Sequence, residues 1–202
     1  MAEMFTSAAA CERMMGRWGT RLAPPFLEFA GIPGRRILDV GSGTGSLVQA
    51  VAERSGGSHI VGIDPAQPFI DYCTWDSNRG LELNVAFWQE AIRLDPAAEH
   101  RAERPRHCNQ EGQLAAVWQA TGFEGIEETS LEMRTDFVSF DDFWLPFTAG
   151  TGPQGVYVAD LSSAKRDALR DALRRRLLGT PPDGSIHLRA KAWAVRGIVP
   201  DR

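Results

Sequence analysis

The chain has few cysteines, and the three it has, Cys11, Cys73 and Cys108, stand far apart among its 202 residues. An odd number without close spacing argues against a disulfide framework, and no two of these thiols have the spacing of a zinc-ligand pair. Dispersed cysteines of this kind are typical of a reducing compartment, so we expect the protein to be cytoplasmic.

Long apolar runs and an excess of basic charge are also missing. No segment is long enough to span a bilayer, and residues 1–10 lack the basic start of a secretory signal. A formal net charge of -4 gives no case for nucleic acid or an anionic membrane as partner. Four histidines are scattered without the spacing of metal ligands, namely His59, His100, His107 and His187. We therefore expect a small-molecule partner and no metal site.

The glycine-rich segment 37–45 is the most informative feature that is present. It reads Ile-Leu-Asp-Val-Gly-Ser-Gly-Thr-Gly and is followed at 61–64 by Val-Gly-Ile-Asp. The pattern predicts a short strand, a glycine turn, a helix over 47–52 and a second strand over 59–63. The strands end near Asp39 and Asp64, and a carboxylate roughly 20 residues after the turn is typical of a βαβ unit that binds a nucleoside cofactor.

The positions of the glycines distinguish two classes of cofactor. A dinucleotide site needs glycine at the first, third and sixth positions, so that the helix packs closely and directs its N-terminus at a pyrophosphate. Here the third glycine stands at the fifth position, and the sixth residue is Ser46. Asp39 would face a diphosphate unfavourably, but it suits a cationic amine. The pattern therefore favours S-adenosylmethionine, which carries such an amine, over a nicotinamide dinucleotide.

Segment 38–45 resembles the first motif of class I S-adenosylmethionine-dependent methyltransferases. Four further segments are similar to bacterial small-molecule methyltransferases related to ubiquinone and menaquinone biosynthesis enzymes: Met15–Trp18, Trp75–Asp76, Phe143–Trp144 and Ala192–Gly197. The resemblance implies backbone contacts from the glycines and a carboxylate, Asp64, that accepts both ribose hydroxyls. The residues that it places at the cofactor are Trp18, Asp39, Gly41, Ser42, Gly43, Gly45, Asp64 and Pro65. It identifies no catalytic residue.

The resemblance covers nearly the whole chain but leaves a gap between Cys73 and Thr74. At roughly 30 residues per strand-helix-strand unit, about two units of the family are absent there. We therefore expect an α/β fold with a Rossmann-like core that lacks its third to fifth strands, a helical extension and a C-terminal antiparallel strand pair. Without the fourth strand, segment 37–40 would be unpaired on one side. One domain over 1–202 is expected, with a cofactor-binding half (1–73) and a C-terminal half with a helical insertion (74–202).

Apolar spacing and turn residues predict the remaining elements. A helix over 12–30 is expected to be interrupted at Pro24 and Pro25. Segment 97–108 is expected to be a surface connection and 150–155 a flexible turn. Further helices are expected at Leu81 to Leu94, after a cap at Asn109, after a cap at Ser139 and through Leu169 to Leu177, and strands at Thr129 to Met133 and at 186–195.

Three functions fit these patterns. The first is methyl transfer from S-adenosylmethionine to a small molecule by in-line displacement, in which positioning and desolvation can supply most of the catalysis. The second is a non-catalytic remnant of that fold, kept as a weak binder or an interaction module. A nicotinamide-dependent oxidoreductase is the third, and Ser46 and Asp39 disfavour it.

Overall fold

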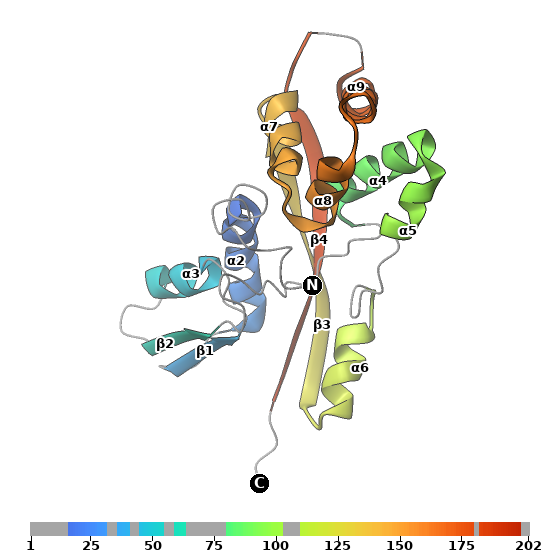
Figure 1. Ribbon diagram of the computed structural model, residues 1–202. Helices are drawn as coiled ribbons and strands as arrows, with labels where there is room; N and C mark the ends of the chain where they lie inside the picture. Colours follow the sequence, from blue (N-terminus) through green and yellow to red (C-terminus); the bar gives the residue numbers. More distant parts are fainter. Residues whose placement is uncertain are drawn as a thin grey trace.

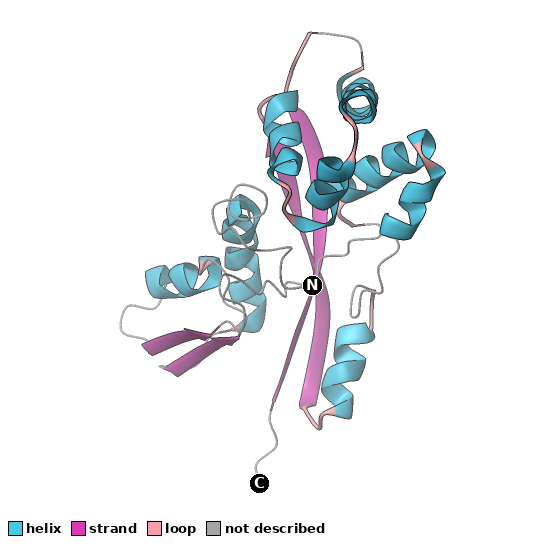
Figure 2. Ribbon diagram, viewed as in Figure 1, coloured by secondary structure: helices cyan, strands magenta, loops and turns pink. Residues whose placement is uncertain are grey.

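The computed structural model describes residues 16–31, 36–40, 45–54, 59–63, 80–102, 110–179 and 182–198. In chain order its elements are α2 (Arg17–Ala30), β1 (Arg36–Val40), α3 (Ser46–Arg54), β2 (His59–Ile63), α4 (Glu82–Leu94), η3 (Pro96–Ala98), α5 (Glu99–Ala102), α6 (Gln113–Ala120), β3 (Glu124–Phe137), α7 (Phe140–Trp144), η4 (Leu145–Ala149), α8 (Gly152–Asp160), α9 (Ser163–Leu178) and β4 (Ile186–Ile198). Figure 2 shows the two strand pairs, each accompanied by helices. The α/β class expected from the sequence is confirmed.

Strands β1 and β2 are parallel, and α3 connects them as the crossover helix. Figure 1 shows α2 and α3 on the same side of this pair. Leu38 and Val61 are register partners, so their side chains point to one common face, and they are 60% and 42% exposed. Within the described ranges β1 pairs with β2 alone. The predicted βαβ unit is therefore confirmed. The described part of its sheet has two strands, which is consistent with the expected loss of the third to fifth strands.

Strands β3 and β4 form a long antiparallel pair, which confirms the expected C-terminal strand pair. In β4, Ile186, Ala190, Ala192 and Ala194 are buried on one face, as alternation in the sequence predicted. Before β3, Gly122 follows α6 with φ +87 and so ends the helix in the left-handed conformation that favours glycine.

Aromatic rings form a continuous chain through the core of the C-terminal half. The Phe137 ring on β3 lies 5.3 Å from that of Phe143 on α7, which lies 5.3 Å from Phe147, and Phe147 lies 4.9 Å from Phe87 on α4. All four side chains are at most 4% exposed. Large rings in edge-on and tilted contact bury much apolar area, so these contacts hold α4, α7 and η4 against the strand pair.

The expected interruption of the first helix at Pro24 and Pro25 is wrong, because α2 runs unbroken through both. Each proline removes one backbone hydrogen bond, a cost that normally breaks a helix. Here the helix buries one face through Leu22, Ala23 and Leu27. The carbonyl oxygen of Pro24 also accepts a hydrogen bond from Arg54 Nη1 of α3, at 3.2 Å. Tertiary packing thus outweighs the local preference.

The expected flexible turn over 150–155 is also wrong, because α8 begins at Gly152. A Cβ at Gly155 would lie 2.9 Å from the carbonyl carbon of Gly150. The glycine is therefore explained by close packing and not by mobility. The expected surface connection over 97–108 contains η3 and α5, and Ala98 is buried. Asn109, the expected cap, lies outside the described residues, and the N-cap of α6 is Gly112.

Candidate functional site

The carboxyl ends of β1 and β2 lie at the same edge of the parallel pair, because Val40 is in register with Ile63. Asp39 stands one residue before that edge, in register with Gly62, and its side chain is half-buried. Ligands of open α/β sheets bind at the carboxyl ends of the strands. Five predicted site residues lie outside the described residues: Gly41, Ser42, Gly43, Asp64 and Pro65.

Gly45 ends the glycine turn and starts α3. Its φ is +84, in the left-handed region that favours glycine, and an added Cβ would meet nothing within 4 Å. The requirement for glycine here is therefore one of backbone conformation and not of space. The Gly45 carbonyl oxygen accepts the Gln49 N–H at 2.8 Å and so closes the first turn of α3. The N–H groups of that turn are the free donors of a helix N-terminus, which carries partial positive charge.

Helix α2 packs against the start of α3. A Cβ on Gly19 would lie only 3.1 Å from Ser46 Oγ, so the two helices approach closely at this point. This contact brings the first turn of α2, with Arg17 and Trp18, beside the end of the glycine turn. The Trp18 side chain is 1% exposed, and its ring meets that of Phe137 edge-on at 5.4 Å. Trp18 thus packs in the core, and its contact with a cofactor stays a prediction.

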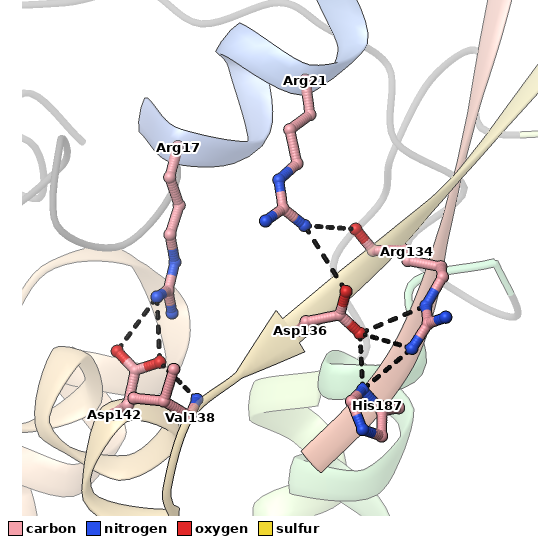
Figure 3. A network of polar contacts seen from close by, with 7 residues as sticks. All are labelled: Arg17, Arg21, Arg134, Asp136, Val138, Asp142 and His187. Carbon is pink, nitrogen blue, oxygen red and sulfur yellow. Dashed lines mark hydrogen bonds and ion pairs between the residues drawn. The ribbon is translucent and has the colours of Figure 1, made fainter. Parts of the chain in front are cut away.

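Helix α2 also contacts the C-terminal half through two arginines (Figure 3). Arg17 Nη1 donates to both carboxylate oxygens of Asp142, at 2.9 and 3.0 Å. Arg21 Nη1 donates to the Arg134 carbonyl oxygen at 3.3 Å and lies 3.7 Å from Asp136 Oδ2. The Arg17 guanidinium carbon is 4.4 Å from the centroid of the Trp18 ring, a cation–π contact. One helix therefore connects the glycine turn to the aromatic helix α7.

Asp136 is the centre of the polar group at the end of the strand pair (Figure 3). Its Oδ1 lies 2.7 Å from Nδ1 of His187, its register partner, and 3.1 Å from Arg134 Nη2. The hydrogen bond from His187 lowers the pKa of the Asp136 carboxyl, and Arg134 lowers it further. The charged carboxylate is thus the favoured form beside Arg21.

The sequence predicts a helix cap at Ser139 and gives Asp142 no role of its own. The cap is present, because Ser139 Oγ accepts the Asp142 N–H at 3.2 Å. Its pairing with Arg17, 125 residues away, left no local signal in the sequence. The close approach at Gly19 was missed for the same reason. No group of histidine, cysteine and carboxylate residues suited to a metal ion occurs in the described part of the chain. No helix in the same ranges is long and apolar enough to cross a membrane.

Comparison with known proteins adds three findings. Residues 37–104 match a family described as a methyltransferase domain. Over 76 residues the chain is 37% identical to the ubiquinone biosynthesis O-methyltransferase of Hahella chejuensis (strain KCTC 2396), a match that covers 38% of this chain and 30% of that protein. The structure of phosphoethanolamine N-methyltransferase 2 of Haemonchus contortus, in complex with phosphomonomethylethanolamine and S-adenosylhomocysteine, aligns with a TM-score of 0.39 at 13% identity, over 97% of this chain and 58% of that one.

Proposed function

We propose that the chain is a class I S-adenosylmethionine-dependent methyltransferase, which binds S-adenosylmethionine at the carboxyl edge of β1 and β2 and methylates a small molecule. The match of residues 37–104 to a methyltransferase domain supports this proposal. The observation that carries the proposal is the combination of a left-handed glycine, Gly45, with a half-buried carboxylate, Asp39, at one strand edge. When bound, S-adenosylmethionine supplies an electrophilic methyl group on a sulfonium, which a nucleophilic atom of the acceptor takes by in-line displacement.

The described residues at this edge fit that cofactor. An added Cβ at Gly45 would meet nothing within 4 Å, so the space beside the main chain of this residue is open to a ligand. Asp39 supplies a carboxylate for the amine of the methionine part, directly or through water. The N-terminus of α3 would be a poor neighbour for a cation, and we propose that it faces the ligand's carboxylate.

The further contacts that we propose follow the resemblance. Gly41, Ser42 and Gly43 would line the same turn, Asp64 would accept the ribose hydroxyls, and Pro65 would stand beside it. We propose that Trp18 acts indirectly, since its ring is buried on Phe137 and its helix fixes Ser46 through Gly19.

We propose one domain over 1–202 in which residues 1–73 bind the cofactor and residues 74–202 face the acceptor. Two hydrogen bonds from α2 support the proposal of one domain. Arg17 and Arg21, in the cofactor-binding half, bond to residues of α7 and β3 in the C-terminal half. The acceptor is proposed to be a small molecule, with catalysis by positioning and exclusion of water and without a metal. The cytoplasm remains our prediction for the compartment.

The curated relative is matched over only 30% of its length, and the first solved structure over 58% of its chain. Within the described residues no strand pairs with the other edge of β1, where a further strand would form one wall of the cofactor site. The second candidate function is therefore a non-catalytic methyltransferase-like module. The exposed Leu38 and Val61 on the parallel pair favour this candidate, because a parallel sheet is normally covered on both faces.

Isothermal titration calorimetry of the full chain with S-adenosylmethionine and S-adenosylhomocysteine tests the proposal. We expect both to bind with one site per chain, and we expect NADH fluorescence to stay unchanged on mixing. Absence of heat at ligand concentrations of about 1 mM, corresponding to a binding free energy weaker than about -4 kcal/mol, would leave the non-catalytic candidate. A change in NADH fluorescence on mixing would instead support the third function, a nicotinamide-dependent oxidoreductase.

A further inference from the structure

A surface cavity of about 400 Å³ lies between the end of α4, α5, α8 and the start of α9. Its volume falls within the range of small-molecule sites, about 300–1,000 Å³. Figure 1 shows these helices well apart from β1, β2 and α3, so the cavity is separate from the glycine turn. Ala98 and Tyr157 are among its lining residues, and they are only 2% and 7% exposed.

Two ion pairs line this cavity, and they come from four different elements. Lys165 Nζ of α9 lies 2.8 Å from Oδ2 of Asp95, which follows α4. Arg101 Nη1 of α5 lies 2.6 Å from Oδ2 of Asp160, the last residue of α8. The two cations and two carboxylates cancel in formal charge. A ligand with several charges of one sign would therefore meet as much repulsion as attraction.

The ion pairs can exchange partners at little cost. The Lys165 and Arg101 side chains are 62% and 45% exposed, and exposed pairs of this kind contribute little to stability. A ligand that carries both a carboxylate and an ammonium can satisfy all four groups at once. Its carboxylate would face Lys165 and Arg101, and its ammonium would face Asp95 and Asp160.

Besides the two ion pairs, the cavity has an aromatic wall, the ring of Tyr157, which ends in a polar hydroxyl group. Its ring packs against Trp88 with centroids 5.4 Å apart, while no described residue hydrogen-bonds its hydroxyl. Burial raises the pKa of this hydroxyl, and the negative charge of Asp95 raises it further, so the group stays a neutral donor. A hydroxyl of a cavity-lining residue that has no hydrogen-bond partner among the described residues is available to a ligand's carboxylate.

From these observations we propose that the cavity binds a small zwitterion with an apolar part, of the kind of a free amino acid. Its carboxylate lies between Lys165, Arg101 and the Tyr157 hydroxyl, its ammonium lies between Asp95 and Asp160, and its apolar part rests on the Tyr157 ring and Ala98. The site does not depend on the proposed methyl transfer, because it shares no residue with the glycine turn.

Calorimetry of the full chain with three probes tests this assignment. L-leucine carries both charges, N-acetyl-L-leucine carries only the carboxylate, and L-leucinamide carries only the ammonium. We expect L-leucine to bind roughly tenfold more tightly than either analogue, since each lost charge removes charge-assisted hydrogen bonds. No heat with L-leucine at concentrations on the order of tens of millimolar, or equal affinity for all three probes, overturns the proposal.

Variants locate the binding. Lys165→Met should reduce the preference for L-leucine over L-leucinamide several-fold, because one of the cations that face the ligand's carboxylate is gone while Arg101 remains. Asp95→Asn should reduce the preference for L-leucine over N-acetyl-L-leucine several-fold, because only Asp160 still faces the ligand's ammonium. Tyr157→Phe keeps the ring and should weaken L-leucine roughly fivefold. The matched control is Arg93→Met, which breaks an exposed pair with Glu90 on α4 outside the cavity and should change no affinity. If both variants keep the affinity ratios of wild type between L-leucine and its two analogues, the proposed site is wrong.

Discussion

Arg17 and Asp142 form an ion pair in which one guanidinium nitrogen donates to both carboxylate oxygens, at 2.9 and 3.0 Å. Arg17 begins α2, and Asp142 lies in the first turn of α7. The two side chains are about one-third exposed, and the guanidinium also lies 4.8 Å from the centroid of the Phe137 ring. This half-buried contact joins the helix beside the glycine turn to the aromatic core.

Arg17→Met should lower the free energy of unfolding by about 1–2 kcal/mol, because it removes a charge-assisted pair and a cation–π contact. Asp142→Asn should have a similar effect. A double-mutant cycle measured by urea unfolding should give a coupling of about 1 kcal/mol, whereas the more exposed Arg101–Asp160 pair should give about 0.5 kcal/mol or less. Additive effects of the two substitutions would show that the pair does not join α2 to α7.

Gly45→Ala should lower the free energy of unfolding by about 1–2 kcal/mol, because φ +84 is unfavourable for any residue with a Cβ. The cause is conformational, since the added Cβ would meet no atom within 4 Å. Gly184→Ala is the matched control, with equally open space and no left-handed backbone. Urea unfolding of the two variants compares them, and equal stability would mean that the turn does not need a left-handed residue at position 45.

The parallel pair of β1 and β2 and its crossover helix α3 were predictable from sequence because their signal is local. Each of these elements follows from spacing within a few residues. The alternation in β4 was predictable for the same reason, since one face of the strand is covered. Contacts such as Gly19 with Ser46, or Arg17 with Asp142, depend on how separate elements pack, and no local pattern carries that information.

Errors occurred where packing overrides a local rule. Pro24 and Pro25 normally end a helix, yet α2 continues because its buried face and Arg54 compensate for lost hydrogen bonds. The glycines at 150–155 were interpreted as a flexible turn, although Gly155 is needed for close contact with Gly150. Composition alone does not distinguish a glycine that provides freedom from one that provides space.

The effect of Asp136→Asn on stability should depend on pH. The pKa of Asp136 is lowered in the folded chain by the His187 hydrogen bond and by Arg134. A lowered folded pKa gives stability that is complete above the ordinary carboxyl pKa and is lost as the pH falls through the folded value. The variant should therefore be less stable than wild type at neutral pH, and the difference should shrink in acid. Thermal unfolding of both proteins across about five pH units, from pH 2 to 7, measures this difference in stability. A difference that does not change with pH would contradict the pairing of Asp136 with His187 and Arg134.

Thr135→Val should stabilise the fold by about 1 kcal/mol. The Thr135 side chain is fully buried, and its hydroxyl has no hydrogen-bond partner among the described residues. Valine has nearly the same shape and leaves no buried polar atom unpaired. Thr129→Val, at a half-buried position of the same strand, should change stability by about 0.5 kcal/mol or less. Destabilisation of Thr135→Val in urea unfolding would indicate that the hydroxyl makes a contact in solution.

The affinity of S-adenosylhomocysteine for Asp39→Asn, measured by calorimetry beside wild type, tests the central claim most directly. Asparagine keeps the size of the side chain and removes its charge at the edge of β1. Loss of a charge-assisted hydrogen bond to the ligand's amine should weaken binding roughly 10- to 100-fold. Asp167→Asn, on the exposed face of α9, should bind like wild type. Equal affinities of Asp39→Asn and wild type would contradict the account, because the carboxylate would then not belong to the cofactor site.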